Sequence, residues 1–283
     1  MRHHFVSFGA GERCWRSSLR RLHREILSLD PSALVRIFDE SSIDGRIGCL
    51  NKDFGEFAKA HPRGYGYWVW KPWVILETMT RANRGDVVLY LDAGCTVNSS
   101  DDAQLRYHDY LARIKETGYL YFSQNFLEKA WTKQEVIKHF ELSNDHQASR
   151  QVLAGIQGHL VCDTEIEFIR EWLHLCTTDE GRLVVDVRDT NAECNEFIEH
   201  RHDQSVLSCL CKVRGRLPIP NETDFFPDWN RQGQQFPFWA TRKCSGLPRW
   251  AGYRSPMLGI KSRWKHLSRH LELNRATSGV IDD

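Results

Sequence analysis

The sequence predicts an α/β fold, in which a mixed, mostly parallel central sheet is flanked by helices and followed by an irregular C-terminal extension. Three observations predict it. Short apolar runs alternate with segments of helical periodicity, a strand, a helix and a strand open the chain in that order, and 283 residues suffice for one large core. We expect a domain over residues 1–216, with the extension over 217–283 packed on or beside it.

The opening strand–helix–strand unit sets the direction of the sheet. The run HFVSF, from His4 to Phe8, is a strand closed by Gly9 and Gly11. Apolar residues then recur at spacings of three and four, which is typical of an amphipathic helix; they are Trp15, Leu19, Leu22, Ile26 and Leu29. The run ALVRIF over 33–38 is the second strand. This order predicts parallel pairing with a right-handed crossover.

Further elements follow along the chain. An aromatic helix is expected over Tyr67–Thr80, then a strand over Val87–Leu91. Another strand is expected over 119–124, and one or two within 152–162. Helices are expected over 132–142 with Thr132 as cap, from Thr164 onward, and after the polar tip at 200–204. Loops and a terminal helix over 261–273 complete the expectation.

Charge and cysteine usage restrict the class of partner and the compartment. The net charge is +1, which gives no support to binding of polyanions by the whole chain, and nucleic acid is not an expected partner. Residues 241–283 nevertheless carry nine Lys/Arg against three Asp/Glu. This basic tail suggests peripheral contact with anionic lipid head groups or an anionic acceptor. Nine scattered cysteines and no apolar leader indicate reduced thiols in a cytoplasmic protein.

Asp92 is the sharpest signal in the chain. Val87–Leu91 is apolar throughout, as in a central strand covered on both faces, and Asp92 follows at its carboxyl end. Ligands bind at that edge of open α/β sheets, although a lone Asp after a strand is also a common loop cap.

The run Tyr90-Leu91-Asp92-Ala93-Gly94 resembles a segment of the Rossmann-like GT-A glycosyltransferases. In that family a YLDAD-type segment binds a sugar-nucleotide diphosphate, and its second carboxylate coordinates a divalent cation. The resemblance implies that Asp92, Ala93 and Gly94 line the nucleotide-sugar site, with Asp92 as the candidate metal ligand. Gly94 stands where the second carboxylate belongs and cannot bind an ion. A requirement for Mn²⁺ or Mg²⁺ is therefore open, and cationic side chains are the alternative.

The aromatic segment before this strand supplies candidate phosphate contacts. The run GYGYWVWKPW resembles the central stretch of a largely uncharacterised group of bacterial and viral GT-A-like proteins. Pro72 favours a helix start near Lys71, and a lysine at a helix start suits a phosphate. Trp70 or Trp68 could stack on a base or sugar. The structural alternative is that the tryptophans are core and Lys71 lies in solvent.

The sequence His202-Asp203-Gln204 precedes an apolar helix and forms a second candidate cluster. One interpretation is that Asp203 simply caps that helix and has no other role. The tip also resembles a late DQ element of several GT-A families, which implies that Asp203 orients a sugar hydroxyl or accepts the acceptor's proton. His202 would bind phosphate, ligate a metal or hydrogen-bond nearby, and Gln204 would contact the nucleotide sugar.

The remaining candidates are implied by the same resemblance. Ser7, near the end of the first strand, and Gly9, just after it, are expected to contact the nucleotide sugar. Lys71 and Lys133 are expected to contact its diphosphate, with Arg63 behind them. Glu128 is expected to touch acceptor or donor. A second-tier carboxylate, Asp186, would replace the missing metal ligand. Small residues at 154, 155 and 158 allow close approach of a ligand or mark a bulge.

These observations lead to a hexosyltransferase-type glycosyltransferase as the first hypothesis. It would move a sugar from a nucleotide-diphosphate-sugar donor to a glycan or lipid-linked glycan, in the synthesis of cell-surface lipopolysaccharide or capsule. Two alternatives stay open. One is a catalytically silent GT-A-like module that binds nucleotide or glycan, which the glycine at position 94 suggests. The other is a sugar nucleotidyltransferase, for which the loop SFGAGERCWR is a loose match.

Overall fold

The structure, a computed structural model, describes residues 1–11, 13–43, 45–187, 190–244 and 247–248. The strands are β1 (His3–Phe8), β2 (Leu34–Phe38), β3 (Val87–Leu91), β4 (Thr96–Val97), β5 (Tyr119–Leu120), β6 (Ser123–Leu127), β7 (Arg150–Val152), β8 (Ile156–Leu160), β9 (Phe238–Trp239), β10 (Lys243–Cys244) and β11 (Leu247–Pro248). The α-helices are α1 (Arg13–Leu29), α2 (Phe54–Ala60), α3 (Gly64–Tyr67), α4 (Trp70–Arg81), α5 (Asp101–Thr117), α6 (Glu128–Trp131), α7 (Gln134–His139), α8 (Asn144–Ala148), α9 (Asp163–Thr177), α10 (Asp203–Val213) and α11 (Trp229–Gln232). Short 3-10 helices cover Glu40–Ser42, Thr178–Gly181 and Thr190–Ala192.

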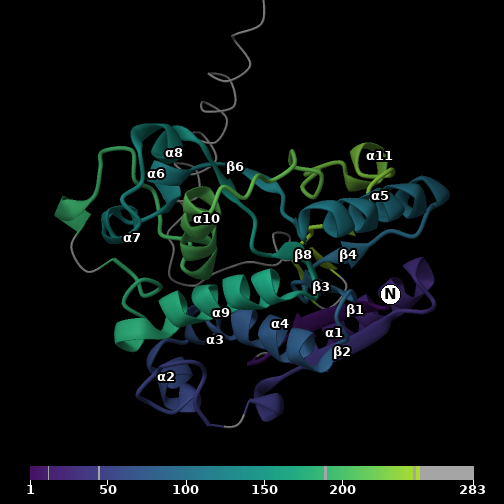
Figure 1. Ribbon diagram of the computed structural model, residues 1–283, viewed down its shortest axis with the longest axis horizontal. Coiled ribbons are helices and arrows are strands. Elements are labelled where there is room, and N and C mark those ends of the chain that lie inside the picture. Colours follow the sequence, from purple (N-terminus) through teal and green to yellow (C-terminus); the bar gives the residue numbers. More distant parts are fainter. Residues whose placement is uncertain (12, 44, 188–189, 245–246, 249–283) are drawn as a thin grey trace, which may run out of the picture. The chain divides into compact units, whose positions relative to one another are not determined.

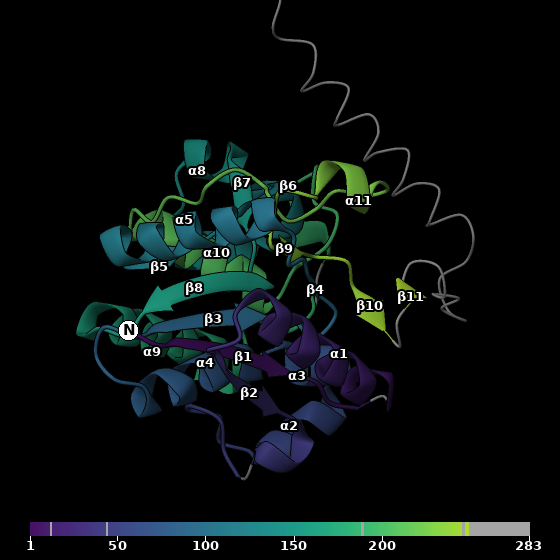
Figure 2. The same ribbon diagram turned by 90° about the vertical axis from the view of Figure 1, so that its right-hand side faces the viewer.

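A central five-stranded sheet has the order β2-β1-β3-β8-β5 (Figures 1 and 2). Strands β2 and β3 both pair with β1 in parallel, and β8 is antiparallel to its neighbours β3 and β5. All strands of this sheet except β8 therefore run in one direction. The expected mixed, mostly parallel sheet flanked by helices is confirmed, and so is the opening strand–helix–strand unit.

Alternating residues of β1 point into two separate cores. Val6 and Phe8 belong to the core that includes side chains from α4 and α9, whereas Phe5 belongs to the core that includes α1 and α5. This is the period-two pattern of a strand covered on both faces. Strand β3, at the centre of the sheet, is buried at every position. Because β1, β2 and β3 are parallel, their carboxyl ends meet at one edge, where Asp92 follows β3.

Beyond β8, a second group of elements packs beside this edge. Strands β6 and β7 pair antiparallel, and α10 lies against β7. Residues 217–244 belong to the same compact unit as the preceding chain: β9 pairs with β4, and Ile219 bridges Phe122. The predicted helix over Lys261–Leu273 and most of the basic tail lie outside the described residues. Within the described part of the chain, every helix is too short or too polar to cross a membrane.

Three local expectations are corrected by the structure. The strand expected over 119–124 is divided into β5 and β6. Helix α7 begins at Gln134, and Thr132 does not cap it, because its hydroxyl donates to Glu128 instead. Helix α9 begins at Asp163, one residue before the expected cap Thr164.

Candidate functional site

Lys71 lies at the centre of a cluster built from three separate elements. Its Nζ is 3.0 Å from Oδ2 of Asp203, the first residue of α10, and 3.4 Å from Oδ1 of Asp92, directly after β3. Lys71 itself sits in the first turn of α4. The sequence hypothesis made Lys71 a contact of the diphosphate, and the structure instead buries its side chain and pairs its ammonium directly with Asp92 and Asp203.

Asp92 is the member of the cluster that reaches solvent. Its side chain is 41% exposed, whereas those of Lys71 and Asp203 are 4% exposed. The hydroxyl of Tyr90 donates to Asp92 Oδ1 over 2.6 Å, which fixes the carboxylate. Gly155 leaves the room that this carboxylate needs, since a Cβ at position 155 would lie 2.6 Å from Asp92 Oδ2. The exposed Asp92 carboxylate at the sheet edge is thus held in place by the Tyr90 hydroxyl and fits into the space left by Gly155.

Burial and charge shift the pKa values of the two hidden members. Burial alone would lower the pKa of Lys71, but the charges of Asp203 and then Asp92 outweigh it, so that the pKa lies above its usual range. Burial raises the pKa of Asp203 to about 6, despite the nearby Lys71, and the charge of Asp92 adds to the increase. Lys71 is therefore a permanent cation beside a carboxyl group that titrates just below neutral pH.

The chain covers Gly94 where a second carboxylate would be needed. The Gly94 carbonyl accepts hydrogen bonds from Thr241 Oγ1 at 3.0 Å and from the Lys243 amide at 2.8 Å. A Cβ at position 94 would lie 3.0 Å from the Cα of Arg242. Glycine at this position is therefore required by close approach of the backbone segment 241–243.

The residues present do not fit a divalent cation. The Lys71 ammonium already lies against both Asp92 and Asp203 and balances one of their two negative charges, and Gly94 offers no side-chain ligand. Asp186, the suggested replacement ligand, instead accepts the Tyr67 hydroxyl at 2.6 Å. No group of three or more His, Cys, Asp or Glu side chains suited to an ion exists among the residues that the structure describes. Mg²⁺ and Ca²⁺ prefer several convergent oxygen ligands, which this cluster does not supply.

His202 presents an unpaired ring nitrogen next to the cluster. Nδ1 lies 2.6 Å from the carbonyl of Val184, so it carries the proton and donates. Nε2 is buried without a hydrogen-bond partner, 3.8 Å from Asp186 Oδ1. The ring stacks on Tyr67, with centroids 4.6 Å apart. Burial and the charge of Arg63 lower the pKa of His202 to about 4, so the neutral ring offers an acceptor for a hydroxyl group rather than a charge for phosphate.

Other predicted contacts of the nucleotide sugar have structural partners. Trp70 is buried, stacks on Phe8 with centroids 4.0 Å apart, and donates to the Gly64 carbonyl. Gln204 donates to Gln151 and accepts from the Ala154 amide, and thereby joins α10 to the 151–154 segment.

The candidates at the ends of β1 and β3 are also placed. Ser7 is buried at the end of β1, and its hydroxyl has no hydrogen-bond partner. The Gly9 amide donates to Phe38, and the buried Ala93 carbonyl accepts from Arg21. These three residues lie near the edge of the sheet. Among their side chains, only the Ser7 hydroxyl could form a hydrogen bond with a ligand.

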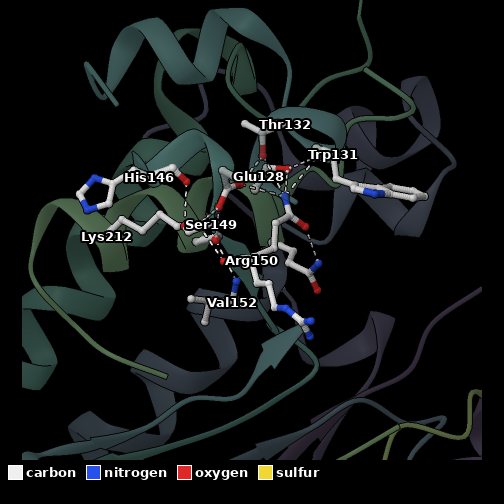
Figure 3. A network of polar contacts seen from close by, with 12 residues as sticks. Glu128, Trp131, Thr132, His146, Ser149, Arg150, Val152 and Lys212 are labelled. Atoms are coloured by element: carbon white, nitrogen blue, oxygen red, sulfur yellow. Dashed lines mark hydrogen bonds and ion pairs between the residues drawn. The ribbon is translucent and has the colours of Figure 1, made fainter. Parts of the chain in front are cut away.

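Glu128 belongs to a separate, closed network (Figure 3). It is fully buried, and its carboxylate accepts from Thr132, Gln151 and Ser208 and forms an ion pair with Lys212. These partners come from the residue after α6, from β7 and from α10, and they leave the carboxylate no exposed oxygen for an acceptor. The network therefore joins the three elements and acts structurally.

Lys133 is likewise not gathered with Lys71. Its Nζ donates to the carbonyls of Arg182 and Val185 and lies 3.0 Å from Glu135. Burial lowers its pKa, although Glu135 opposes the change. Arg63 pairs with Asp186 and Glu199. Lys133 is thus engaged away from Lys71, and Arg63, whose charge acts on His202, is paired with two carboxylates.

Sequence reasoning missed a disulfide that holds the segment over Gly94. Cys14 of α1 pairs with Cys244 of β10, with their Cα atoms 5.4 Å apart. The expectation that all cysteines are reduced is wrong for this pair, whereas seven other cysteines are free in the described part of the chain. The partners are 230 residues apart, and no spacing signal could have revealed them. The disulfide joins residues 241–244 to α1.

Two surface hollows lie away from the cluster. One is on α1 beside Arg20 and Arg24, and the other is lined by α9 residues together with Arg214 and Arg216. Neither contains Lys71, Asp92 or Asp203. The exposed Asp92 carboxylate therefore marks the candidate site.

Comparison with known proteins gives distant structural similarity only. No family model matches the chain, and no curated protein matches its sequence. Several solved structures resemble it, among them three of glycosyltransferases. One, "involved in the glycosylation of the major capsid of PBCV-1", has 10% identity and a TM-score of 0.48, covering 91% of this chain and 100% of its own. The galactosyltransferase LgtC, "in complex with donor and acceptor sugar analogs", has 12% identity and a TM-score of 0.46, covering 99% and 97%. Mouse xyloside xylosyltransferase 1 has 8% identity and a TM-score of 0.40, and the match covers 88% of this chain and 96% of its own. Likeness of this degree does not establish a shared activity.

Proposed function

We propose that this chain is a glycosyltransferase of the GT-A type, which transfers a sugar from a nucleoside-diphosphate-sugar donor to a hydroxyl group. One observation carries the proposal. A buried ammonium, Lys71, holds two carboxylates at the carboxyl edge of a mostly parallel sheet, and one of them, Asp92, reaches solvent. Ligands of open α/β sheets bind at that edge.

Each member of the cluster has a proposed role. Asp92 accepts hydrogen bonds from hydroxyl groups of the donor's ribose or sugar, which suits an exposed carboxylate anchored by Tyr90. Lys71 holds Asp92 in one orientation, because its ammonium lies within ion-pair distance. The charge of Asp203 raises the pKa of Lys71. The pKa of Asp203 itself is about 6, just below neutral pH.

His202 is the proposed contact of the acceptor. Its Nε2 lone pair and Asp186 Oδ1 are acceptors 3.8 Å apart, beside the rings of Tyr67 and Trp68. A sugar presents an apolar ring face for stacking together with hydroxyl donors for such a pair of acceptors. The hydroxyl that attacks the donor would lie here, next to Asp203.

The finer parts of the proposal concern the acceptor and its location. We propose a hexosyl donor and a glycan or lipid-linked glycan acceptor of the cell surface, handled on the cytoplasmic side. The peripheral membrane contact proposed for the basic tail falls on residues outside those that the structure describes. Liposome binding by the full chain and by a chain ending at residue 246 tests it, and equal partitioning of the two would contradict it.

A thermal-shift screen with nucleotide sugars tests the central function. Each donor is added in EDTA and again with Mn²⁺, and any donor that raises the Tm is then assayed for released nucleotide. We expect at least one donor to raise the Tm of the wild type and of the Asp102→Asn control, an exposed carboxylate on α5. The Asp92→Asn variant should lose the shift.

The outcomes separate the alternatives. Release of nucleoside diphosphate in the presence of an acceptor supports transfer. A Tm shift without any release supports the silent binding module, which the covered Gly94 favours. If no nucleotide sugar shifts the Tm, both hypotheses fail.

A further inference from the structure

Arg201 is a cation held in a fixed position next to the candidate site. Its guanidinium carbon lies 4.5 Å from the ring centroid of Trp131 and 5.0 Å from that of Phe126. Such stacking fixes the plane of the group and leaves its edge available for hydrogen bonds. Its Nε is buried and has no hydrogen-bond partner. Arg201 is separated by one residue from Asp203 in the sequence.

The backbone of Arg242 lies against Gly94, in the turn that follows β3. Its Cα would be 3.0 Å from a Cβ at position 94, and Gly94 is two residues from Asp92. Its backbone has φ +52°, a left-handed conformation that an arginine adopts only where the surroundings impose it. The hydrogen bonds from Thr241 and Lys243 to the Gly94 carbonyl impose it here. The side chain is exposed.

The two guanidinium groups lie close enough to influence each other. Burial, and next the positive charge of Arg242, lower the pKa of Arg201 to about 10. Other cations of this region are neutralised: Lys71 by Asp92 and Asp203, and Arg63 by Asp186 and Glu199. Neither Arg201 nor Arg242 takes part in these ion pairs. Across the described residues, no ion pair joins either of them to a carboxylate. The charges of Glu199 and Asp203 oppose the fall in the pKa of Arg201 without forming an ion pair with it. Two cations that repel each other and lack a direct ion pair favour an anion between them.

We propose that Arg201 and Arg242 form a diphosphate-binding site beside Asp92, which does in this chain what a divalent cation does elsewhere. The inference rests on the proposed function, because it names the groups that hold the donor's diphosphate. Two guanidinium groups offer charge and paired N–H donors that match phosphate oxygens. Position 94 is consistent with this replacement of a cation by arginines, since the segment that carries Arg242 fills the space that a metal-binding side chain at position 94 would take.

Binding of diphosphates in a chelator tests the proposal. The full chain is titrated calorimetrically with inorganic pyrophosphate, UDP and GDP in EDTA, and again with Mn²⁺. We expect at least one of these to bind in EDTA, with little change on adding Mn²⁺. Arg201→Gln and Arg242→Gln should each weaken its Kd roughly 10- to 100-fold, as expected for loss of hydrogen bonds to a charged group. The slope of log K against log salt should become less steep.

Matched variants keep the test sharp. Arg20→Gln, an exposed arginine on α1, should bind as the wild type does. Because Arg201 is packed against two aromatic rings, Arg242→Gln, at an exposed side chain, is the deciding variant if Arg201→Gln loses stability. Arg201→Lys should keep part of the affinity through its charge.

The failures of the two proposals differ. If diphosphates bind to the wild type only with Mn²⁺, and Arg242→Gln binds equally well, the arginine site is wrong while the donor site stands. If neither diphosphates nor nucleotide sugars bind under any condition, the proposed function itself fails, and the arginine site fails with it. Binding of inorganic phosphate as tight as that of pyrophosphate would also contradict a site built for two linked phosphates.

Discussion

Replacing Asp203 by Asn should remove a pH-dependent loss of stability that the candidate site imposes on the fold. The Asp203 carboxyl is buried at the start of α10, and burial raises its pKa to about 6 from an ordinary 3.8. A raised pKa means that the folded state keeps this proton when the unfolded state has released it. The stabilising effect of that proton is present at low pH and is lost as the pH rises from 3.8 through 6.

The size of the effect follows from the two pKa values. A difference of about two units corresponds to about 3 kcal/mol in the free energy of unfolding at neutral pH, relative to strongly acidic solution. Roughly half of it, about 1.4 kcal/mol, is lost between pH 5 and pH 8. Asn at position 203 does not titrate, and Asp92 remains beside the Lys71 ammonium in the variant. The variant therefore lacks this slope.

Guanidinium chloride unfolding of both proteins at pH 5, 6, 7 and 8 measures the difference. We expect the wild type to lose about 1.4 kcal/mol more than Asp203→Asn over this interval. Asp102→Asn serves as control and should follow the wild type. A constant difference between wild type and Asp203→Asn from pH 5 to pH 8, or a steeper loss in the variant, would refute the reasoning.

Three further predictions concern residues around the site. Gly94→Asp should lower the free energy of unfolding by roughly 1–3 kcal/mol, because the new Cβ would meet the backbone of residue 242 at 3.0 Å. The added carboxylate should not make nucleotide binding depend on Mn²⁺. A Mn²⁺-dependent gain in the affinity of this variant would contradict the prediction. Glu128→Gln should cost about 3 kcal/mol, since Lys212 loses its buried partner, and should leave nucleotide affinity unchanged; weaker binding at unchanged stability would restore Glu128 to the site. Cys14→Ser should lower stability by roughly 2–4 kcal/mol, as should reduction of the wild type, because the disulfide to Cys244 is lost; unfolding curves that coincide in oxidised and reduced wild type would sink this expectation.

Elements with strong periodicity could be predicted from the sequence, and elements defined by local hydrogen bonds could not. The apolar run Val87–Leu91 forms β3 with the predicted bounds, since a doubly covered strand needs apolar residues on both faces. Helix α5 (Asp101–Thr117) was not predicted, although Ser100 caps it and Gly118 ends it in a left-handed conformation. Its exposed face is rich in polar residues and weakens the pattern. Its capping residues were the available signal.

The candidate site was predictable in part, for a similar reason. Asp92 stands out because a carboxylate ends an apolar strand, and the sheet topology places that end at the ligand-binding edge. The partnership of Lys71 with Asp203 depends on how α4 and α10 pack, which no local spacing encodes. The same holds for Arg242, which reaches the site through a segment nearly 150 residues after Gly94 in the sequence. Lys133 looked equivalent to Lys71 in sequence, but its ammonium meets two carbonyls elsewhere.

The most direct test is a crystal structure of the chain with the nucleoside diphosphate that binds most tightly in solution. We predict density for the diphosphate between the guanidinium groups of Arg201 and Arg242, with a ribose or sugar hydroxyl on the Asp92 carboxylate. A nucleotide bound away from the end of β3, or one that leaves Asp92 without contact at saturating concentration, would contradict the account.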